Sequence, residues 1–376
     1  MVLLIGNYPL DRQQSMLRFA NMMVEGLATA GVPTELIQPR PLFGSFTMAG
    51  GFVAKWLGYI DKFLIFPRHL RARLEKGSTC VVHICDHSNA MYAKHVRGTP
   101  VVVTCHDLLA VRGARGEATD TPASATGKFL QRWIVSGLRS AAAVPCISQA
   151  TLRDAQQIVT QGRENPKLEL ITLGLNYPYR ELPETEVQRR LNDLSELRDN
   201  ARFALHVGSN LRRKNREAVL RIFASVADQW DGRLVFAGEE LNPSLRSQAA
   251  GLGIADRVVE VRSPGNELLE VLYNRATALL FPSRFEGFGW PIAEAEACGC
   301  PVICSATPPM DEVGGAGALL RDVEDEAGFA SDLLRLADPA ERSRWSTQAL
   351  ESAERFATDR MIAKYCTLYR SLAPAC

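Results

Sequence analysis

The chain has 376 residues, of which 46% are hydrophobic and 23% charged, and its formal net charge is +1. This length exceeds one ordinary hydrophobic core, so we expect about two domains of ~150–200 residues each. The composition is that of a soluble globular protein. No apolar run approaches the ~18–20 residues of a membrane span, and the first residues lack the pattern of a signal peptide, so we expect a cytoplasmic protein.

Short apolar runs alternate with helical patterns along the whole chain. Strands are expected at residues 2–5, 80–84, 101–104, 142–147 and 168–173, with a helix over residues 16–30 near the start. A second series of strands follows at residues 203–207, 234–238, 258–261, 278–281 and 302–304. This alternation predicts an α/β fold in which two Rossmann-like units with parallel sheets follow each other.

The boundary between the two units is marked by a polar, proline-punctuated stretch at residues 176–186. We interpret it as an interdomain linker with a helix after it. The predicted organisation is an N-terminal domain over residues 1–176, a linker over 177–200 and a C-terminal domain over 201–354. Residues 355–376 contain a final helix.

Nine cysteines stand at positions 80, 85, 105, 146, 298, 300, 304, 366 and 376. Their number is odd, their spacing does not pair them as metal ligands, and several fall inside apolar runs. We therefore expect reduced, buried thiols.

The charge is distributed unevenly. Residues 1–180 carry 20 Lys and Arg against 12 Asp and Glu, whereas residues 181–376 carry 23 against 30. Within the basic half, residues 55–66 interleave aromatic and cationic side chains and are followed by Arg68, His69, Arg71 and Arg73. This pattern suits peripheral contact with an anionic membrane surface. The helical spacing of Trp56, Ile60 and Phe63 equally suits burial in a core.

Polar residues follow several of the predicted strands. Gly208 to Asn215 come directly after the first strand of the second series and include Ser209, Arg213 and Lys214. His106 and Asp107 follow the strand at residues 101–104, and His83, Asp86 and His87 form another cluster. The carboxyl ends of parallel strands are where ligands bind in such sheets. Asp107 could equally cap the next helix, and the second cluster could contact an acceptor.

Residues 281–294, Phe-Pro-Ser-Arg-Phe-Glu-Gly-Phe-Gly-Trp-Pro-Ile-Ala-Glu, place Glu286 and Glu294 eight positions apart around a glycine loop. We expect Pro291 to be the first helical residue. The amides of Phe288 to Ile292 would then lie at a helix N-terminus, which favours phosphate. Glu286 would lie in the loop and Glu294 in the first helical turn, where both could accept hydrogen bonds from hydroxyl groups.

This segment resembles the E-x7-E signature of the family 4 retaining glycosyltransferases, with its Glu-Gly-Phe-Gly core. Gly208 to Asn215 are similar to that family's Gly-x5-Lys-Asn arrangement, although Ser209 stands where an Arg is more usual. Cys105 to Leu109 resemble its His-Asp-Leu segment. The layout resembles the GT-B fold across nearly the whole chain, while the specific motifs lie mostly in residues 203–313. The resemblance implies two domains facing a cleft, with the last helix, 355–376, packing back on the N-terminal acceptor-binding domain.

The resemblance also implies the roles of individual residues. Arg213 and Lys214 would neutralise the leaving diphosphate, Glu286 would hold hydroxyls of the sugar, Glu294 the ribose, and His106 would orient the sugar. Six further positions are expected to contact the donor: Gly208, Ser209, Ser263, Gly287, Phe288 and Gly289. Because the chain has no Asp-x-Asp sequence, we expect no metal or other cofactor, and charge stabilisation by cations and helix amides instead.

The predicted activity is transfer of a hexose, from GDP-mannose or a UDP-sugar, to a hydroxyl of a glycan or lipid-linked acceptor, with retained configuration. Surface polysaccharide synthesis, at the inner face of the cytoplasmic membrane, is the expected setting by analogy. No nucleic acid partner is expected. Two alternatives stay open: a GT-B nucleotide-sugar epimerase or hydrolase, and an inactive GT-B interaction module. An NAD-dependent oxidoreductase would need a Gly-x-Gly-x-x-Gly loop after a first strand, and neither domain has one.

Overall fold

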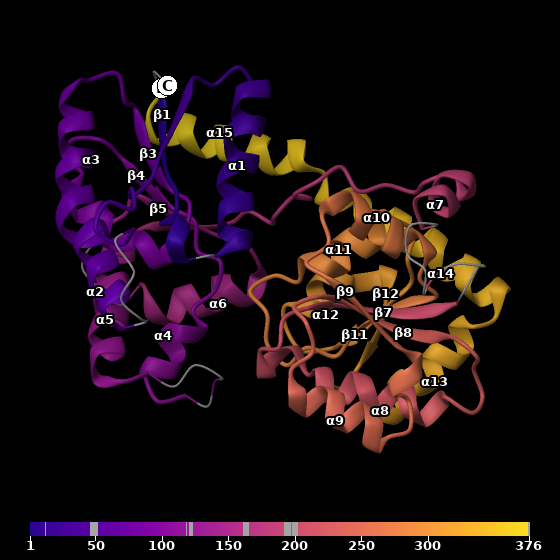
Figure 1. The fold of residues 1–376 in the computed structure, drawn as a ribbon. Coiled ribbons are helices and arrows are strands. Elements are labelled where there is room, and N and C mark those ends of the chain that lie inside the picture. The colour runs from indigo at the N-terminus through magenta and orange to yellow at the C-terminus, as the bar shows by residue number, and fades with distance from the viewer. Residues whose placement is uncertain are drawn as a thin grey trace. The chain divides into compact units, whose positions relative to one another are not determined.

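The computed structural model describes all residues except 12, 46–51, 118, 120–122, 161–164, 192–196, 198–201, 375 and 376, and it leaves the side chains of 52–55 undescribed. Contacts between residues divide the chain into two compact units. Unit 1 comprises Met1–Asn176 together with Thr358–Cys376, and unit 2 comprises Tyr177–Ala357. Figure 1 labels helices and strands of both units.

Unit 1 is built on a six-stranded sheet in the order β2-β1-β3-β4-β5-β6, in which every pair is parallel. The strands are β1 (Val2–Ile5), β2 (Thr34–Ile37), β3 (Val81–Ile84), β4 (Val101–Val103), β5 (Ala143–Cys146) and β6 (Lys167–Leu170). The helices are α1 (Gln14–Thr29), α2 (Phe52–Ile60), the π-helix η2 (Asp61–Ile65), α3 (Phe66–Glu75), the 3-10 helix η3 (His87–His95), α4 (Leu109–Ala114), α5 (Ala125–Arg139), α6 (Gln149–Ile158) and α15 (Thr358–Leu372). Strands β1, β3, β4 and β5 are wholly buried, which is why they appear in the sequence as unbroken apolar runs.

Unit 2 has the same architecture, with a six-stranded parallel sheet in the order β12-β11-β10-β7-β8-β9. Its strands are β7 (Phe203–Gly208), β8 (Arg233–Gly238), β9 (Val258–Arg262), β10 (Ala278–Phe281), β11 (Val302–Ser305) and β12 (Ala318–Arg321). Its helices are α7 (Glu184–Leu191), α8 (Arg216–Val226), α9 (Pro243–Gly251), α10 (Asn266–Arg275), α11 (Trp290–Ala297), α12 (Met310–Gly314), α13 (Glu326–Leu336) and α14 (Pro339–Ala353). The two sheets establish the predicted α/β class with two Rossmann-like domains.

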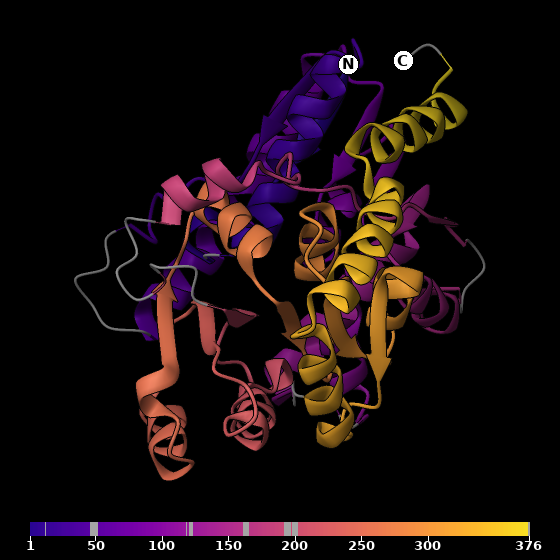
Figure 2. The same ribbon diagram turned by 90° about the vertical axis from the view of Figure 1, so that its right-hand side faces the viewer.

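The last helix, α15, belongs to unit 1 although it follows unit 2 in the sequence. It lies beside α1 and appears yellow in Figures 1 and 2. The hydroxyl of Tyr369 lies 2.7 Å from Nδ1 of His83, whose Nε2 lies 2.7 Å from the hydroxyl of Thr104. Thr104 in turn bonds the hydroxyl of Tyr365 at 2.8 Å. Both nitrogens of a wholly buried imidazole are thereby satisfied, so this network ties α15 to the sheet.

Strands β2 and β12 were absent from the sequence-based prediction. Strand β2 is an edge strand that begins Thr-Glu and is only partly buried, and β12 is a four-residue edge strand that follows a glycine-rich stretch. Neither offers the long apolar run that marks a central strand.

The segment expected to be an interdomain linker packs on unit 2 where the structure describes it. The amide of Arg180 donates to the buried Glu270 at 3.2 Å, and the amide of Leu182 donates to Asn274 at 2.7 Å. Helix α7 continues the same contact against α10. Backbone hydrogen bonds to side chains of α10 hold the segment in place.

Seven cysteines are free and buried: 85, 105, 146, 298, 300, 304 and 366. Cys80 is disulfide-bonded, so the expectation of reduced thiols is wrong at that position. Its side chain lies at the start of β3, where Sγ is 3.2 Å from the backbone oxygen of Met1. An isolated cysteine beside a strand gave no sign of a bonded partner in the sequence.

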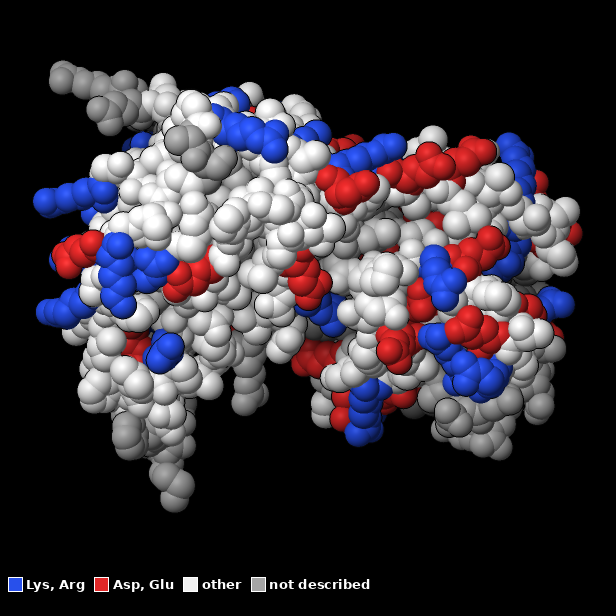
Figure 3. Space-filling model, turned by 90° about the horizontal axis from the view of Figure 1, so that it is seen from above, with Lys and Arg blue, Asp and Glu red and all other residues white. Residues whose placement is uncertain are grey.

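The aromatic segment of α2 and η2 divides between core and surface. Trp56 is 54% exposed and Leu64 is 55% exposed, whereas Phe63 packs on the hydrophobic core and lies 5.2 Å from the ring of Trp133. Among the described residues, no helix is both long and apolar enough to cross a membrane. In Figure 3 acidic and basic side chains lie next to one another on the right, while larger uncharged areas separate them on the left.

We predict that Tyr369→Phe destabilises the fold by about 1–3 kcal/mol, because it leaves Nδ1 of the buried His83 without a partner. Urea unfolding followed by circular dichroism measures the loss. The matched control is Tyr59→Phe, since no hydrogen bond involves the Tyr59 hydroxyl in the described structure. Equal stabilities of the two variants would contradict the role assigned to the buried network.

Candidate functional site

Unit 2 brings several backbone segments together at the carboxyl edge of its sheet. Gly208 at the end of β7 pairs with Gly238 at the end of β8, and the amide of Ser263 after β9 donates to the oxygen of Gly238 at 2.8 Å. Gly238 has φ +125°, and a side chain there would place its Cβ 2.3 Å from the oxygen of Gly208. Glycine is therefore required for the close approach of the two strand ends.

The loop after β7 is held by an arginine that sequence reasoning missed. Arg216, the first residue of α8, is only 2% exposed. Its guanidinium donates to the side-chain oxygen of Asn210 and to the backbone oxygens of Glu239 and Gly208, at 2.8, 2.8 and 2.6 Å. Burial lowers the pKa of Arg216 to about 10, so it remains charged at neutral pH. The signal in the sequence was that Arg216, Val219, Leu220 and Phe223 share one buried helical stripe.

Two cations of this loop converge on one buried carboxylate. Nη1 of Arg213 lies 2.5 Å from Oε2 of Glu286 and 3.0 Å from the backbone oxygen of Phe285, while Nζ of Lys214 lies 2.6 Å from Oε1 of Glu286. Arg212 is exposed and has no ion pair within the described residues. Arg213 is therefore the arginine that the fold brings to the site.

Local backbone geometry fixes the position of both cations. Asn215 adopts φ +55° and donates its side-chain amide to the oxygen of Pro282 at 3.0 Å, while the amide of Arg284 donates to the oxygen of Arg213 at 2.7 Å. Lys214 lies along Gly208, where a Cβ would be 3.2 Å from its Cδ, and its Nζ is 4.9 Å from the centre of the Phe281 ring. The loops after β7 and β10 are thus joined at their bases.

The electrostatics of the three groups are coupled. Burial alone would raise the pKa of Glu286, but the charges of Lys214 and Arg213 outweigh it, and the pKa is lowered. Burial lowers the pKa of Lys214, and the carboxylate of Glu286 opposes that effect. Two positive charges against one negative charge leave one positive charge in excess, which suits an anionic ligand.

Helix α11 follows the glycine loop, but it begins one residue earlier than expected. Trp290 is its first residue, and Pro291 occupies the second position, where a missing N–H is still tolerated. Gly289 precedes the helix with φ +104°, a conformation that favours glycine. The amide of Ile292 is already used by the oxygen of Gly289 at 2.9 Å, so it is not free to bind phosphate.

Glu294 lies in the second turn of α11 rather than the first. It is 3% exposed, and the hydroxyl of Tyr273 donates to its Oε2 at 2.9 Å. Burial, together with the nearby Glu294 charge, raises the pKa of Tyr273. Tyr273 holds the carboxylate from α10, a contact between helices that no spacing in the sequence indicated.

His106 lies in unit 1, directly after β4, and is 3% exposed. Its Nε2 lies 2.8 Å from the oxygen of Cys85, so Nε2 carries the proton and donates to this carbonyl. Its Nδ1 is buried and has no hydrogen-bond partner in the described part of the chain. Burial lowers the pKa of His106, which leaves the ring neutral with Nδ1 as an unused acceptor.

Other polar residues of unit 1 make separate contacts. Asp86 is buried and accepts from the amide of Asn7 at 2.6 Å, and His87 lies 3.2 Å from the same carboxylate. His83 instead faces α15 and is closed off by it, so its expected contact with an acceptor is wrong. Asp107 accepts from the amide of Leu109, the first residue of α4, at 3.0 Å; this is a turn contact just before the helix, whose N-cap position is Leu108.

Unit 2 thus places two cations against a carboxylate at the edge of its sheet, and unit 1 places a neutral histidine whose Nδ1 has no partner among the described residues. Among the described residues, no three His, Cys, Asp or Glu side chains gather as metal ligands. Two doubly wound parallel sheets with polar residues at their carboxyl edges define a two-domain α/β protein of the Rossmann-like class. A glycosyltransferase group 1 model matches residues 188–352, and a glycosyl transferase 4-like domain model matches residues 16–174. The chain belongs to the family 4 glycosyltransferases.

Known proteins agree with this assignment. The chain is 28% identical over 288 residues to a D-inositol 3-phosphate glycosyltransferase of Acidothermus cellulolyticus, a match covering 73% of this chain and 62% of that protein. It is 33% identical over 108 residues to O-antigen chain mannosyltransferase B of Escherichia coli, covering 28% of each. Its fold is similar to that of sucrose-phosphate synthase from Thermosynechococcus elongatus, with TM-score 0.78, 20% identity, and coverage of 100% and 99% of the two chains. This likeness establishes the GT-B fold.

A second buried carboxylate of α11 gives a test of how the helix is held. Glu296 is wholly buried, accepts from the Ser352 hydroxyl at 2.9 Å, and lies 3.6 Å from the guanidinium of Arg355. Burial raises its pKa to about 8. Between its ordinary value of 4.5 and about 8 the folded state keeps a proton that the unfolded state has lost, so stability falls as pH rises through that window.

We therefore predict that Glu296→Gln gains thermal stability relative to the wild type as pH rises from about 5 to about 8, because the glutamine has no proton to lose. Differential scanning calorimetry across this range measures the difference in melting temperature. The exposed Glu351→Gln on α14 is the control and is expected to show no such trend. A constant difference for Glu296→Gln at all pH values would contradict a raised pKa.

Proposed function

We propose that the protein is a retaining, metal-independent hexosyltransferase. It would move a hexose from a nucleotide diphosphate sugar, GDP-mannose or a UDP-sugar, to a hydroxyl of a glycan or lipid-linked acceptor. The observation that carries the proposal is the convergence of Arg213 and Lys214 on the buried Glu286 at the carboxyl edge of the unit 2 sheet. Family membership supports the reaction class, and retention is inherited from the resemblance.

The ion pairs suggest an exchange of partners during binding. Without ligand, Glu286 is the counter-ion of both cations, and it is almost wholly shielded from water. A diphosphate carries more negative charge than one carboxylate, so it would compete for Arg213 and Lys214. Glu286 would then turn its oxygens to hydroxyls of the sugar. The cations would thus be kept in place before the donor arrives, without reorganisation at the moment of transfer.

In the proposed reaction, the acceptor oxygen forms a bond to the anomeric carbon of the sugar as the bond from that carbon to the diphosphate oxygen breaks. The bonding electrons leave with the nucleoside diphosphate, and the hydroxyl proton passes to its oxygen. Arg213 and Lys214 would stabilise the charge that develops there, and Glu294 would hold the ribose. His106 would accept a hydrogen bond from a sugar hydroxyl at Nδ1, which has no partner among the described residues. Backbone groups at Gly208, Ser209, Ser263 and Gly287–Gly289 would complete the donor contacts.

Donor, acceptor and pathway rest on the relatives. The mannosyltransferase among them supports mannose as the sugar, and its O-antigen role supports surface polysaccharide synthesis. The inositol phosphate glycosyltransferase is instead compatible with a phosphorylated acceptor. We further propose that the enzyme works at the cytoplasmic face of a membrane, which the exposed side chains of Trp56 and Leu64 support.

We predict that Arg213→Ala and Lys214→Ala each lower turnover on the order of 10²–10³-fold, because each removes a group that stabilises the departing diphosphate. Arg212→Ala should leave turnover nearly unchanged, since Arg212 is exposed and has no ion pair in the described structure. Transfer from each radiolabelled donor, measured with excess EDTA present, tests the cations and metal independence together. Equal loss in all three variants would contradict the assignment.

Calorimetric titration of GDP, UDP and ADP into the wild type and Lys214→Ala identifies the donor nucleotide and separates the alternatives. An inactive interaction module need not bind any nucleotide. An epimerase or hydrolase would bind one and form product without acceptor. Binding of one nucleotide, lost in Lys214→Ala, together with acceptor-dependent product, is the result expected of a transferase.

We also predict that His106→Ala lowers turnover on the order of 10²-fold while leaving nucleotide affinity unchanged, because His106 would contact the sugar and not the diphosphate. Since the pKa of His106 is lowered by burial, no loss of activity from its protonation is expected between pH 8 and its ordinary value of 6.5. Parallel titrations and pH–rate profiles measure both effects. A marked loss of nucleotide affinity in His106→Ala would place the residue elsewhere in the reaction.

A further inference from the structure

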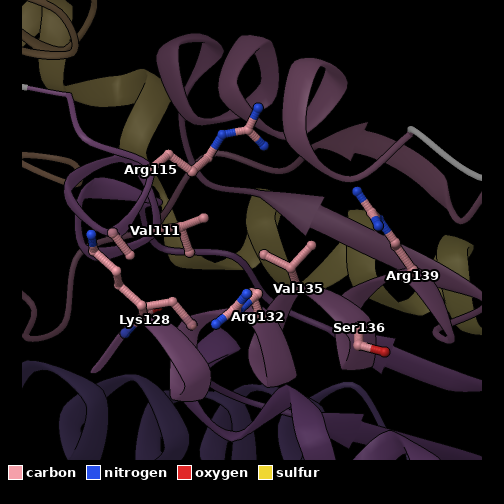
Figure 4. A pocket seen from close by; sticks show the side chains of 9 residues that line it. Val111, Arg115, Lys128, Arg132, Val135, Ser136 and Arg139 are labelled. Carbon is pink, nitrogen blue, oxygen red and sulfur yellow. The ribbon is translucent and has the colours of Figure 1, made fainter. Parts of the chain in front are cut away.

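Unit 1 contains a cavity between α4 and α5 that none of the proposed roles uses. Its volume is about 430 Å³. Four cations line it, namely Arg115, Lys128, Arg132 and Arg139, while Val111 and Val135 contribute apolar surface. In Figure 4 the two valines lie in the middle of the cavity, and the cationic side chains are distributed around them. Among the residues that the structure describes, no carboxylate lines the cavity.

Three of these cations have no anionic partner. Within the part of the chain that the structure describes, Arg115, Lys128 and Arg132 form no ion pair, and Arg139 donates to the backbone oxygens of Ile158 and Val159. Glu117 and Asp154 both pair with Arg112, which is not a lining residue of the cavity. Like charges placed around one hollow repel each other, so the arrangement favours the entry of an anion.

A second hollow adjoins the first and is lined in part by aromatic side chains. It has a volume of about 580 Å³, shares Arg132 and Ser136 with the first, and is further lined by Lys94, Phe129 and Trp133. Phe129 is 66% exposed, which is unusual for a phenylalanine on a helix that also carries Lys128 and Arg132. Cations beside an exposed aromatic ring suit a ligand with a charged head and an apolar remainder.

We infer that the cavity between α4 and α5 binds the phosphate group of an amphipathic phosphate ester, with the apolar remainder against Phe129 and Trp133. One arginine guanidinium can donate two parallel hydrogen bonds to two oxygens of a phosphate. Several arginines around one hollow therefore favour binding of a phosphate group. The phosphate could belong to an anionic membrane lipid or to the lipid of a lipid-linked acceptor. The inference concerns unit 1 alone and would hold whichever nucleotide sugar unit 2 binds.

The test compares two triple variants of the full chain. In the cavity variant, Arg115, Lys128 and Arg132 are each replaced by Ala. In the control variant, Arg40, Lys76 and Arg97, which are exposed cations of the same unit, are replaced by Ala, so both proteins lose equal charge. Binding to phosphatidylcholine vesicles with and without phosphatidylglycerol is measured by co-sedimentation, and binding of inorganic pyrophosphate by calorimetry.

We expect the wild type and the control variant to bind at least one of these phosphate probes and the cavity variant to bind it at least about tenfold more weakly. If the cavity variant loses binding only to vesicles with phosphatidylglycerol, the phosphate belongs to a membrane lipid. If it loses binding to pyrophosphate, the phosphate belongs to a ligand that binds from solution. Equal weakening of both variants, or no binding by the wild type, overturns the inference. Binding of the donor nucleotide should persist in both variants, so failure of the cavity is distinguishable from failure of the proposed transfer.

Discussion

Parallel pairing of strands is the constraint on which both units depend. A parallel sheet is covered by helices on both faces, so its interior strands can carry almost nothing but apolar side chains. Polar chemistry is then confined to the loops that leave the carboxyl ends of the strands. Lys214 and Glu286 in unit 2, and His106 in unit 1, all occupy such loops. Their positions follow from the topology of the sheets more than from any local preference of the chain.

Buried charge in unit 2 is tolerated because each charged group has its own partners. Glu286 stays ionised between Arg213 and Lys214, whereas Glu296, with only a hydroxyl and a more distant guanidinium, has its pKa raised. Arg216 is buried without a carboxylate but donates to three oxygens. The first case leaves excess positive charge for a ligand, and the other two fix helices and loops around it.

The two units treat their cations differently. In unit 2 the cations of the site are paired with a carboxylate, which holds them in place. In unit 1 the cations around the cavity between α4 and α5 lie at the surface without a counter-ion in the described structure. The first arrangement suits a small ligand that must be bound in one orientation. The second suits a charged group presented by a larger assembly, where orientation comes from the assembly itself.

The sequence alone determined the fold class and most strands, and it singled out Arg213, Lys214 and Glu286, which the structure brings together. Buried parallel strands appear as apolar runs, and residues such as Lys214 and Glu286 lie at fixed offsets from them. Only the tertiary structure decided that Arg213, rather than Arg212, reaches Glu286, that Arg216 and Tyr273 support the site, and that His83 is closed off by α15. Each of these outcomes depends on contacts between segments far apart in the chain; His83 and Tyr369, for example, are separated by 286 positions. The local sequence pattern carries no information about such pairings.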